Sequence, residues 1–198
     1  MAELKLRYLV GIGALAAALL LGALAGTAIS RAYNDYDNPP CTRPYSGGGS
    51  YLSVWWRNHN NFPPTGDYNS AFISARSSWN GTATPVWFTH SPSTVETHGV
   101  QSFGQNGALG HVDGMCIMGS WTTIVWLNSY YLDNMSYSWK QKVAAHELGH
   151  QIRLGHSYYY AVMRPDGNVA PVSPTSDDVC GVNTRYPSTS WPAGWWCF

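Results

Sequence analysis

The chain has 198 residues, with 11 Lys and Arg and 11 Asp and Glu, so its formal net charge is zero. Only 11% of its residues are charged, whereas 14% are aromatic, including 10 Trp and 13 Tyr. This composition suits one globular domain with a sizeable core, and since no basic patch or run occurs, we expect no nucleic-acid partner.

The N-terminal segment 1–32 has the features of a targeting sequence. Lys5 and Arg7 precede an uncharged stretch over residues 8–29 that is rich in Ala, Leu and Gly. A positive start, an apolar core and small residues at its end are typical of a cleaved export signal. A stretch of about 20 apolar residues is also long enough to span a bilayer. We therefore expect a signal peptide or, alternatively, a membrane anchor, with the rest of the chain secreted or held outside the membrane.

The next segment, 33–50, contains three prolines and three consecutive glycines, which predicts a linker or a short pro-segment. The folded domain is expected over residues 51–198. Residues 51–57 alternate and are rich in aromatic side chains, which predicts a strand. Asp67 is a suitable helix cap, and apolar residues spaced for one buried face predict a helix over 67–79. The residues on this face are Ala71, Phe72, Ala75 and Trp79.

Further strands and helices are predicted in the rest of the chain. Strands are expected over 84–90 and 99–103, a short edge strand over 108–112 and a central, β-branched strand over 121–128. A capping-box pattern that starts at Ser138 predicts a helix over 139–152. A second capped helix is predicted within 173–186.

The most informative residues are His146, Glu147, His150 and His156. On a helix, the first two histidines lie one turn apart on one face, so both imidazoles can reach one metal ion. Gly155 suits a turn that brings the third imidazole to the same ion. Three neutral nitrogens and a water molecule make the open zinc geometry of a hydrolase, and Glu147 can reach that water. The alternative, ordinary histidines on a polar helix face, is disfavoured because three of the 7 histidines gather around one Glu.

Residues 146–157, HELGHQIRLGHS, resemble the long zinc signature of the metzincin peptidases, and the segment around Met163 resembles the Met-turn of that clan. Within the clan, residues 143–147 and 175–182 resemble the starts of the active-site helix and the C-terminal helix of the matrixin family. The resemblance extends over residues 50–187. It implies an α+β, metzincin-type catalytic domain with a small twisted mixed sheet, an active-site helix, a Met-turn and a C-terminal helix. It also implies that Met163 is a hydrophobic floor beneath the histidines and not a ligand.

Two positions depart from the metzincin pattern. Arg153 replaces the glycine midway between the second and third histidines. If the turn of the family is kept, this residue has a positive φ at a cost on the order of 1–2 kcal/mol. Pro165 stands where astacins carry a tyrosine ligand, which disfavours that subfamily.

A second, structural zinc is also considered, because matrixins carry one on an HxD pattern with two further histidines. Here His98 lacks the Asp, and His111 is the one further histidine near the expected place. Two imidazoles do not make a closed site, so we expect one catalytic zinc and neither structural zinc nor calcium. His98 and His111 are expected to be solvated or hydrogen-bonded within the protein.

Four cysteines, in an exported chain, predict two disulfides with three possible connectivities, among which the sequence does not choose. Residues 39–44 faintly resemble the matrixin cysteine switch, in which a thiolate caps the zinc until the propeptide is cut. Cys41 is therefore either half of a disulfide or such a latch, and the even number of cysteines favours the disulfide. The four residues are Cys41, Cys116, Cys180 and Cys197.

Together, the motif and the resemblance predict an exported zinc-dependent endopeptidase with Glu147 as its general base. An extended substrate is expected to bind along the edge strand at Leu109 and Gly110, with Pro165 in the wall of the specificity pocket. The expected partners are protein or peptide substrates, with a membrane involved only if the N-terminal segment is retained, and we expect a monomer. The alternative is a catalytically silent, zincin-like extracellular binding module, which would have no need of Glu147.

Overall fold

The computed structural model describes residues 52–60, 67–105, 107–117 and 120–187. The expected signal or anchor and the expected linker lie outside these ranges. None of the helices within them has the length and apolar character that a bilayer crossing requires.

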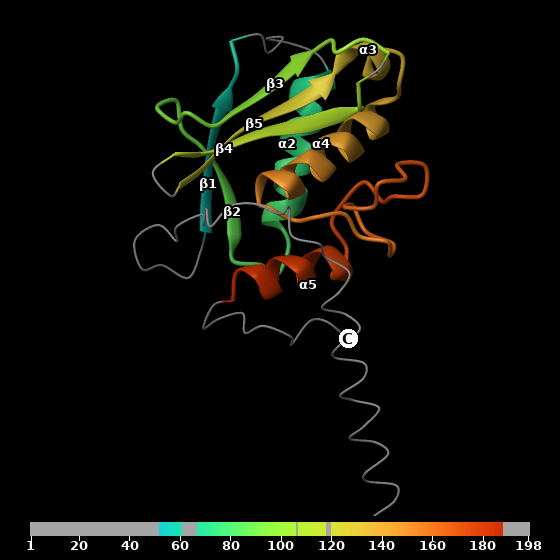
Figure 1. The fold of residues 1–198 in the computed structure, drawn as a ribbon. Coiled ribbons are helices and arrows are strands. Elements are labelled where there is room, and N and C mark those ends of the chain that lie inside the picture. Colours follow the sequence, from blue (N-terminus) through green and yellow to red (C-terminus); the bar gives the residue numbers. More distant parts are fainter. Residues whose placement is uncertain (1–51, 61–66, 106, 118–119, 188–198) are drawn as a thin grey trace, which may run out of the picture.

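A five-stranded mixed sheet organises the domain (Figure 1). Its parallel strands are β1 (Leu52–Asn58), β2 (Val86–His90), β3 (Thr97–Gln101) and β5 (Ser120–Asn128), and β4 (Gly110–Ile117) runs antiparallel to β5. The order across the sheet is β2-β1-β3-β5-β4, so β4 is an edge strand and β5 lies inside the sheet, as predicted. Each predicted strand overlaps an observed one, although β4 extends farther than the short strand expected there.

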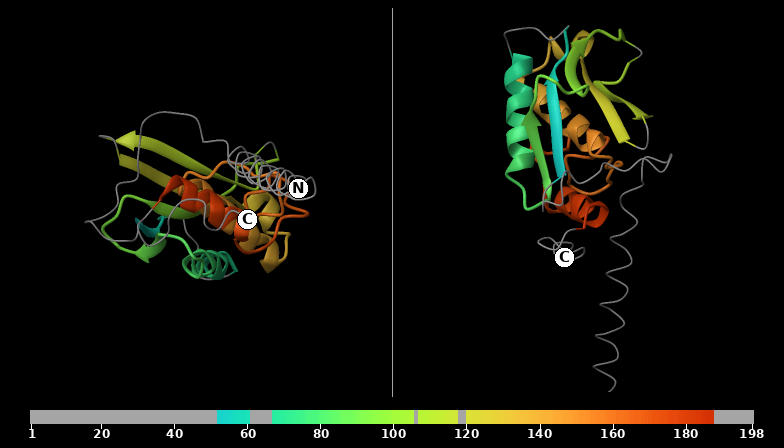
Figure 2. Two further views of the ribbon diagram at one scale, coloured as in Figure 1. Left: turned by 90° about the horizontal axis from the view of Figure 1, so that it is seen from below. Right: turned by 90° about the vertical axis from the view of Figure 1, so that its left-hand side faces the viewer.

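Helices α2 (Asp67–Asn80) and α4 (Tyr137–Gln151) pack against each other on one face of the sheet. The short α3 (Ser129–Leu132) joins β5 to α4, and α5 (Ser176–Arg185) lies at one end of the domain (Figure 2). Strands and helices in this mixed arrangement confirm the predicted α+β class.

The buried face of α2 is the predicted one. Ala71, Phe72, Ala75 and Trp79 are each 0% exposed. The indole Nε1 of Trp79 donates a hydrogen bond of 2.9 Å to the carbonyl of Ala145, which joins α2 to α4 in the core. Since a buried indole N–H needs an acceptor, this bond lets a large aromatic side chain be buried completely.

The predicted start of α4 is wrong by two residues. The helix begins at Tyr137 with Ser136 as its N-cap residue, and no side-chain cap hydrogen bond forms. Ser138 lies inside the first turn, whereas a capping side chain needs the extended backbone that Ser136 has. For α5 the predicted capped helix is confirmed, because Thr175 and Asp178 form a reciprocal capping box.

Candidate active site

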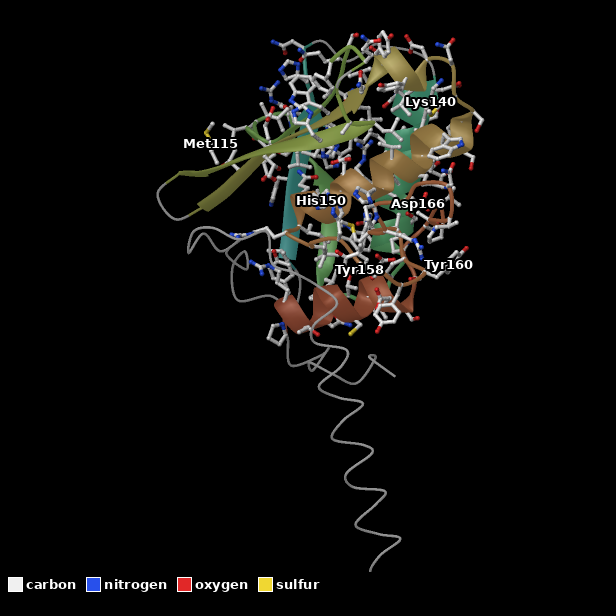
Figure 3. The ribbon with its side chains drawn as sticks, turned by 45° about the vertical axis from the view of Figure 1, so that its right-hand side comes forward. Met115, Lys140, His150, Tyr158, Tyr160 and Asp166 are labelled. Atoms are coloured by element: carbon white, nitrogen blue, oxygen red, sulfur yellow. The ribbon has the colours of Figure 1, made fainter. Side chains whose placement is uncertain are left out.

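Three histidines meet at the C-terminal end of α4. His146 and His150 lie one turn apart on the helix, and His156 follows after the chain has left it. One nitrogen from each ring lies within 4.8 Å of the others. His150 is near the middle of the domain, whereas Tyr158 lies on the exposed loop that follows His156 (Figure 3). The structure thus brings together the three side chains that the sequence motif singled out.

Backbone carbonyls orient two of these rings. Nδ1 of His146 lies 2.8 Å from the carbonyl oxygen of Val162, and Nδ1 of His150 lies 2.8 Å from that of Leu154. A carbonyl oxygen only accepts, so Nδ1 carries the proton and Nε2 is the nitrogen suited to a metal. Burial lowers the pKa of His146 to about 4 and that of His150 to about 3, so both rings are neutral at pH 7. Neutral imidazoles in a group of three are a donor set that fits zinc.

The turn after α4 has the backbone that its family resemblance implies. Arg153 has φ 65° and is the one non-glycine residue with positive φ in the described part of the chain. The N–H of Leu154 bonds to the carbonyl of Gly149 and the N–H of Arg153 to that of His150, at 3.0 and 2.8 Å. This pair of bonds is the Schellman helix ending, which requires a left-handed residue at Arg153 and usually has glycine there. The expected positive φ is therefore confirmed, and the turn directs the chain toward His156.

Met163 packs beneath the helix that carries the first two histidines. Its side chain is fully buried. A Cβ atom built on Gly149 would clash with the Met163 sulfur, so the sulfur lies directly against the backbone of α4 at this glycine. Gly149 lies inside the zinc motif but was not predicted to be part of the site, although a glycine inside a helical pattern is itself a signal of close approach.

Asp178 is a second residue that the sequence motif did not predict to be part of the site. Its buried carboxylate accepts hydrogen bonds from the backbone N–H groups of Val162, Met163 and Thr175, at 2.9, 3.1 and 2.8 Å. The cap of α5 therefore also fixes the turn that contains Met163. The same turn presents the carbonyl of Val162 to His146, so Asp178 acts on the histidine through the backbone.

A cleft of about 350 Å³ opens onto the three histidines. Glu147 lines it, and so do Leu109, Gly110 and Pro165, the residues expected to bind substrate. Glu147 is buried, and its Oε2 has no hydrogen-bond partner among the described residues. Burial raises the pKa of Glu147 to about 8. A carboxylate that has no hydrogen-bond partner and lies beside three imidazoles suits a site that binds a cation. The positive charge of that cation would lower the pKa of Glu147 again.

The two other histidines considered as ligands lie outside the group of three. His98 is fully buried, and its ring nitrogens bond to Arg76 and Gln151, as expected for a histidine satisfied within the protein. The ring of His111 lies at the edge of the cleft, 3.3 Å from the carboxylate of Asp113. Within the described ranges, the three clustered histidines are the one group of metal-ligating side chains.

The cysteines are only partly covered by the described residues. Cys180, on α5, takes part in a disulfide bond. Cys116 lies on β4, while Cys41 and Cys197 lie outside the described ranges. The disulfide connectivity therefore stays a prediction with three alternatives, and so does the choice between a disulfide and a zinc latch for Cys41.

Comparisons with known proteins show a similarity of fold and no match of sequence. No family model matches the chain, and no curated protein matches it. Among solved structures, it is similar to High choriolytic enzyme 1, a hatching enzyme zinc-protease from the medaka fish Oryzias latipes, with a TM-score of 0.51 and 12% sequence identity. The match covers 78% of this chain and 100% of that one. At 12% identity this similarity shows the fold alone. The α+β arrangement is similar to that of a zinc-protease, and the comparison does not show to which family the chain belongs.

Proposed function

We propose that this protein is a zinc-dependent endopeptidase. The observation that carries the proposal is the arrangement of His146, His150 and His156 around the cleft in which Glu147 also lies. The three histidines would hold zinc, which supplies a Lewis acid when bound. The fold of a zinc protease supports the same conclusion.

Glu147 would act as the general base. Its carboxylate lies in the cleft, where it can take a proton from an attacking water molecule and return it to the leaving amine. The raised pKa of about 8 belongs to the buried carboxyl without a cation beside it. Because a positive charge nearby favours the ionised form, the group would be ready to accept a proton at neutral pH once the metal site is filled.

The edge strand β4 would hold the substrate. Gly110, His111 and Val112 of this strand line the cleft. An extended peptide can add to a sheet edge through main-chain hydrogen bonds, which suits a cleft that runs along such an edge. A Cβ atom at Gly110 would lie 2.9 Å from Glu147 Oε1, so glycine here keeps space around the base.

The finer assignments rest on the sequence. They are membership of the matrixin family, export by a cleaved signal or with a retained anchor, one zinc per chain, two disulfides and a monomeric state. Together they describe an extracellular peptidase that acts on proteins or peptides.

Digestion of casein by the full-length protein tests the proposal, with and without a zinc chelator. We expect cleavage that the chelator abolishes and added zinc restores. Glu147→Gln should retain zinc and lose activity by about 10²–10⁴-fold, since only the base is removed. Zinc binding by the parent protein without any cleavage would instead support the binding module. Full activity of Glu147→Gln with verified zinc content would contradict the role of Glu147.

A further inference from the structure

The charges that line the cleft are unbalanced. Apart from its histidines, the charged side chains of the cleft are Lys142, Arg164 and Glu147. In the proposed function Glu147 transfers protons as the general base, so it is not available to pair with a cationic side chain. The cleft therefore keeps two cationic side chains that the reaction itself does not use.

Lys142 is held at the wall of the cleft. It precedes His146 by four residues on α4 and so lies on the same face of the helix. Its Nζ donates to the carbonyl of Gly167 at 2.7 Å and lies 4.6 Å from the ring centroid of Trp139. An ammonium group has three N–H donors, so this contact leaves two for a ligand.

Arg164 provides the second positive charge, directly after Met163. Its Nη1 donates a long hydrogen bond of 3.4 Å to the carbonyl of Tyr158. A guanidinium has five N–H donors, and a carboxylate can accept two of them at once. Within the described ranges, neither Lys142 nor Arg164 forms an ion pair with an Asp or Glu side chain.

We propose that this cleft selects peptides with a carboxylate next to the scissile bond and that Lys142, assisted by Arg164, binds it. The inference rests on the proposed peptidase function and names its substrate class. A carboxylate would complete the donors of Lys142 in a half-buried site, where a charge-assisted hydrogen bond is stronger than in water. Apolar residues of the cleft, including Val143, Val162 and Ala170, would contact the stem of an Asp or Glu side chain.

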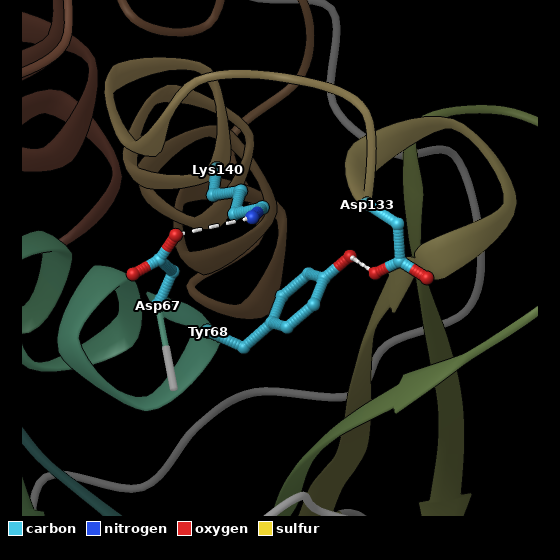
Figure 4. Close-up of polar contacts among 4 residues, drawn as sticks. All are labelled: Asp67, Tyr68, Asp133 and Lys140. Carbon is cyan, nitrogen blue, oxygen red and sulfur yellow. Dashed lines mark hydrogen bonds and ion pairs between the residues drawn. The ribbon is translucent and has the colours of Figure 1, made fainter. Parts of the chain in front are cut away.

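The same chain offers a matched control. Lys140 lies two residues before Lys142 on α4 but faces α2 (Figure 4). Its Nζ lies 3.3 Å from Asp67 Oδ2 and 4.9 Å from the ring centroid of Tyr68, whose hydroxyl donates to Asp133. Lys140 does not line the cleft. Lys140→Met therefore removes one positive charge from the same helix without altering the cleft wall.

The test compares fluorogenic peptides with amidated C-termini that differ only in Asp, Asn or Lys at either residue flanking the scissile bond. We expect the full-length protein, loaded with zinc, to prefer Asp over Asn by about tenfold or more in kcat/KM at one of the two positions. Lys142→Met should bring this ratio close to one, and Lys142→Glu should favour Lys over Asn. Arg164→Met should reduce the ratio less, and Lys140→Met should leave it unchanged. Using a ratio separates selectivity from any general loss of activity.

A ratio near one in the parent protein, or a ratio that persists in Lys142→Met, would overturn the inference. Peptides with a free C-terminal carboxylate directly after the scissile pair distinguish a chain terminus from an acidic side chain as the source of the charge. Equilibrium binding of the Asp and Asn peptides to Glu147→Gln gives a second readout. No cleavage of any peptide would contradict the proposed function, whereas equal binding of the two peptides would contradict the charge selection alone.

Discussion

His98 and the clustered histidines of the same domain differ in the groups that surround their ring nitrogens. The ring of His98 is stacked between Trp56 and Phe72, with centroid distances of 5.3 and 5.0 Å. Its Nδ1 lies 3.0 Å from Arg76 Nη1 and its Nε2 lies 2.9 Å from Gln151 Oε1. Because Arg only donates, Nδ1 accepts and Nε2 donates, so the protein uses both nitrogens of this ring.

His146 and His150 differ in the partner of one nitrogen. A backbone carbonyl accepts a hydrogen bond from Nδ1 of each ring. The other nitrogen is left for the cluster that these two rings form with His156. His98 and His150 are both buried, so burial alone does not separate a structural histidine from a metal-binding one. What separates them is whether side chains of the fold or other imidazoles surround Nε2.

The largest expected effect comes from removing one of the three clustered histidines. His156→Ala should lower zinc affinity by more than about 100-fold and abolish peptidase activity, because one of three ligands is lost. Since the side chain of His156 is exposed, the apo protein should unfold near the parent's denaturant midpoint. Equilibrium dialysis with zinc and urea unfolding measure the two quantities. Unchanged zinc stoichiometry would exclude His156 as a ligand.

The reverse result is expected for His98. His98→Ala removes two buried hydrogen bonds and a ring between two aromatic side chains, which should cost about 3 kcal/mol of unfolding free energy. Zinc stoichiometry at a temperature where the variant is folded should stay at the parent value. Loss of zinc from the folded variant would mean that His98 belongs to a metal site after all.

A smaller effect is expected where Met163 meets α4. Gly149→Ala places a methyl group against the Met163 sulfur and should destabilise the protein by about 1–3 kcal/mol, although Ala favours a helix. Urea unfolding checks this value. The double variant Gly149→Ala/Met163→Ala is the control, and its loss should be less than the sum of the two single losses. Strict additivity would show that the methyl group and the sulfur do not conflict.

The smallest expected effect isolates the backbone at Arg153. Arg153→Gly and Arg153→Ala both remove the buried side chain, but only glycine relieves the strain of φ 65°. Arg153→Gly should therefore be more stable than Arg153→Ala by about 1 kcal/mol, after the greater freedom of glycine in the unfolded chain is counted. Thermal and urea unfolding of the pair measure the difference. Equal stabilities would contradict a strained turn, and lost activity in both variants would give the Arg side chain a role of its own.

The features that could be predicted from the sequence are those that depend on neighbouring residues along the chain. The buried face of α2 follows from helical spacing, and the spacing of His146 and His150 places two ligands one turn apart. The conformation of Arg153 followed from a resemblance that carries a backbone requirement at one position. The predicted start of α4 is wrong because the sequence offers two serines, Ser136 and Ser138, and only the extended backbone of Ser136 shows which one is the N-cap residue.

Contacts between distant segments were not predictable in the same way. Gly149 and Met163 meet only because the chain turns back under α4, and Asp178 reaches that turn from α5. None of these three residues belongs to a periodic sequence pattern from which its contact partner could be predicted. For Lys142, the sequence shows a lysine on the active-site helix, whereas its place at the cleft wall depends on Trp139 and Gly167 packing beside it.

The carboxylate of Asp178 has a consequence for local unfolding. One side chain receives N–H groups from the turn at Val162 and Met163 and from Thr175 at the start of α5. Neither segment can open without breaking bonds that also hold the other. The amide protons of these three residues should therefore exchange with deuterium at a common, slow rate, and Asp178→Asn should speed up all three together. If the three amides exchange together, the turn that positions the histidines and α5 form one cooperative unit, and α5 maintains the site although it contributes no side chain to the cleft.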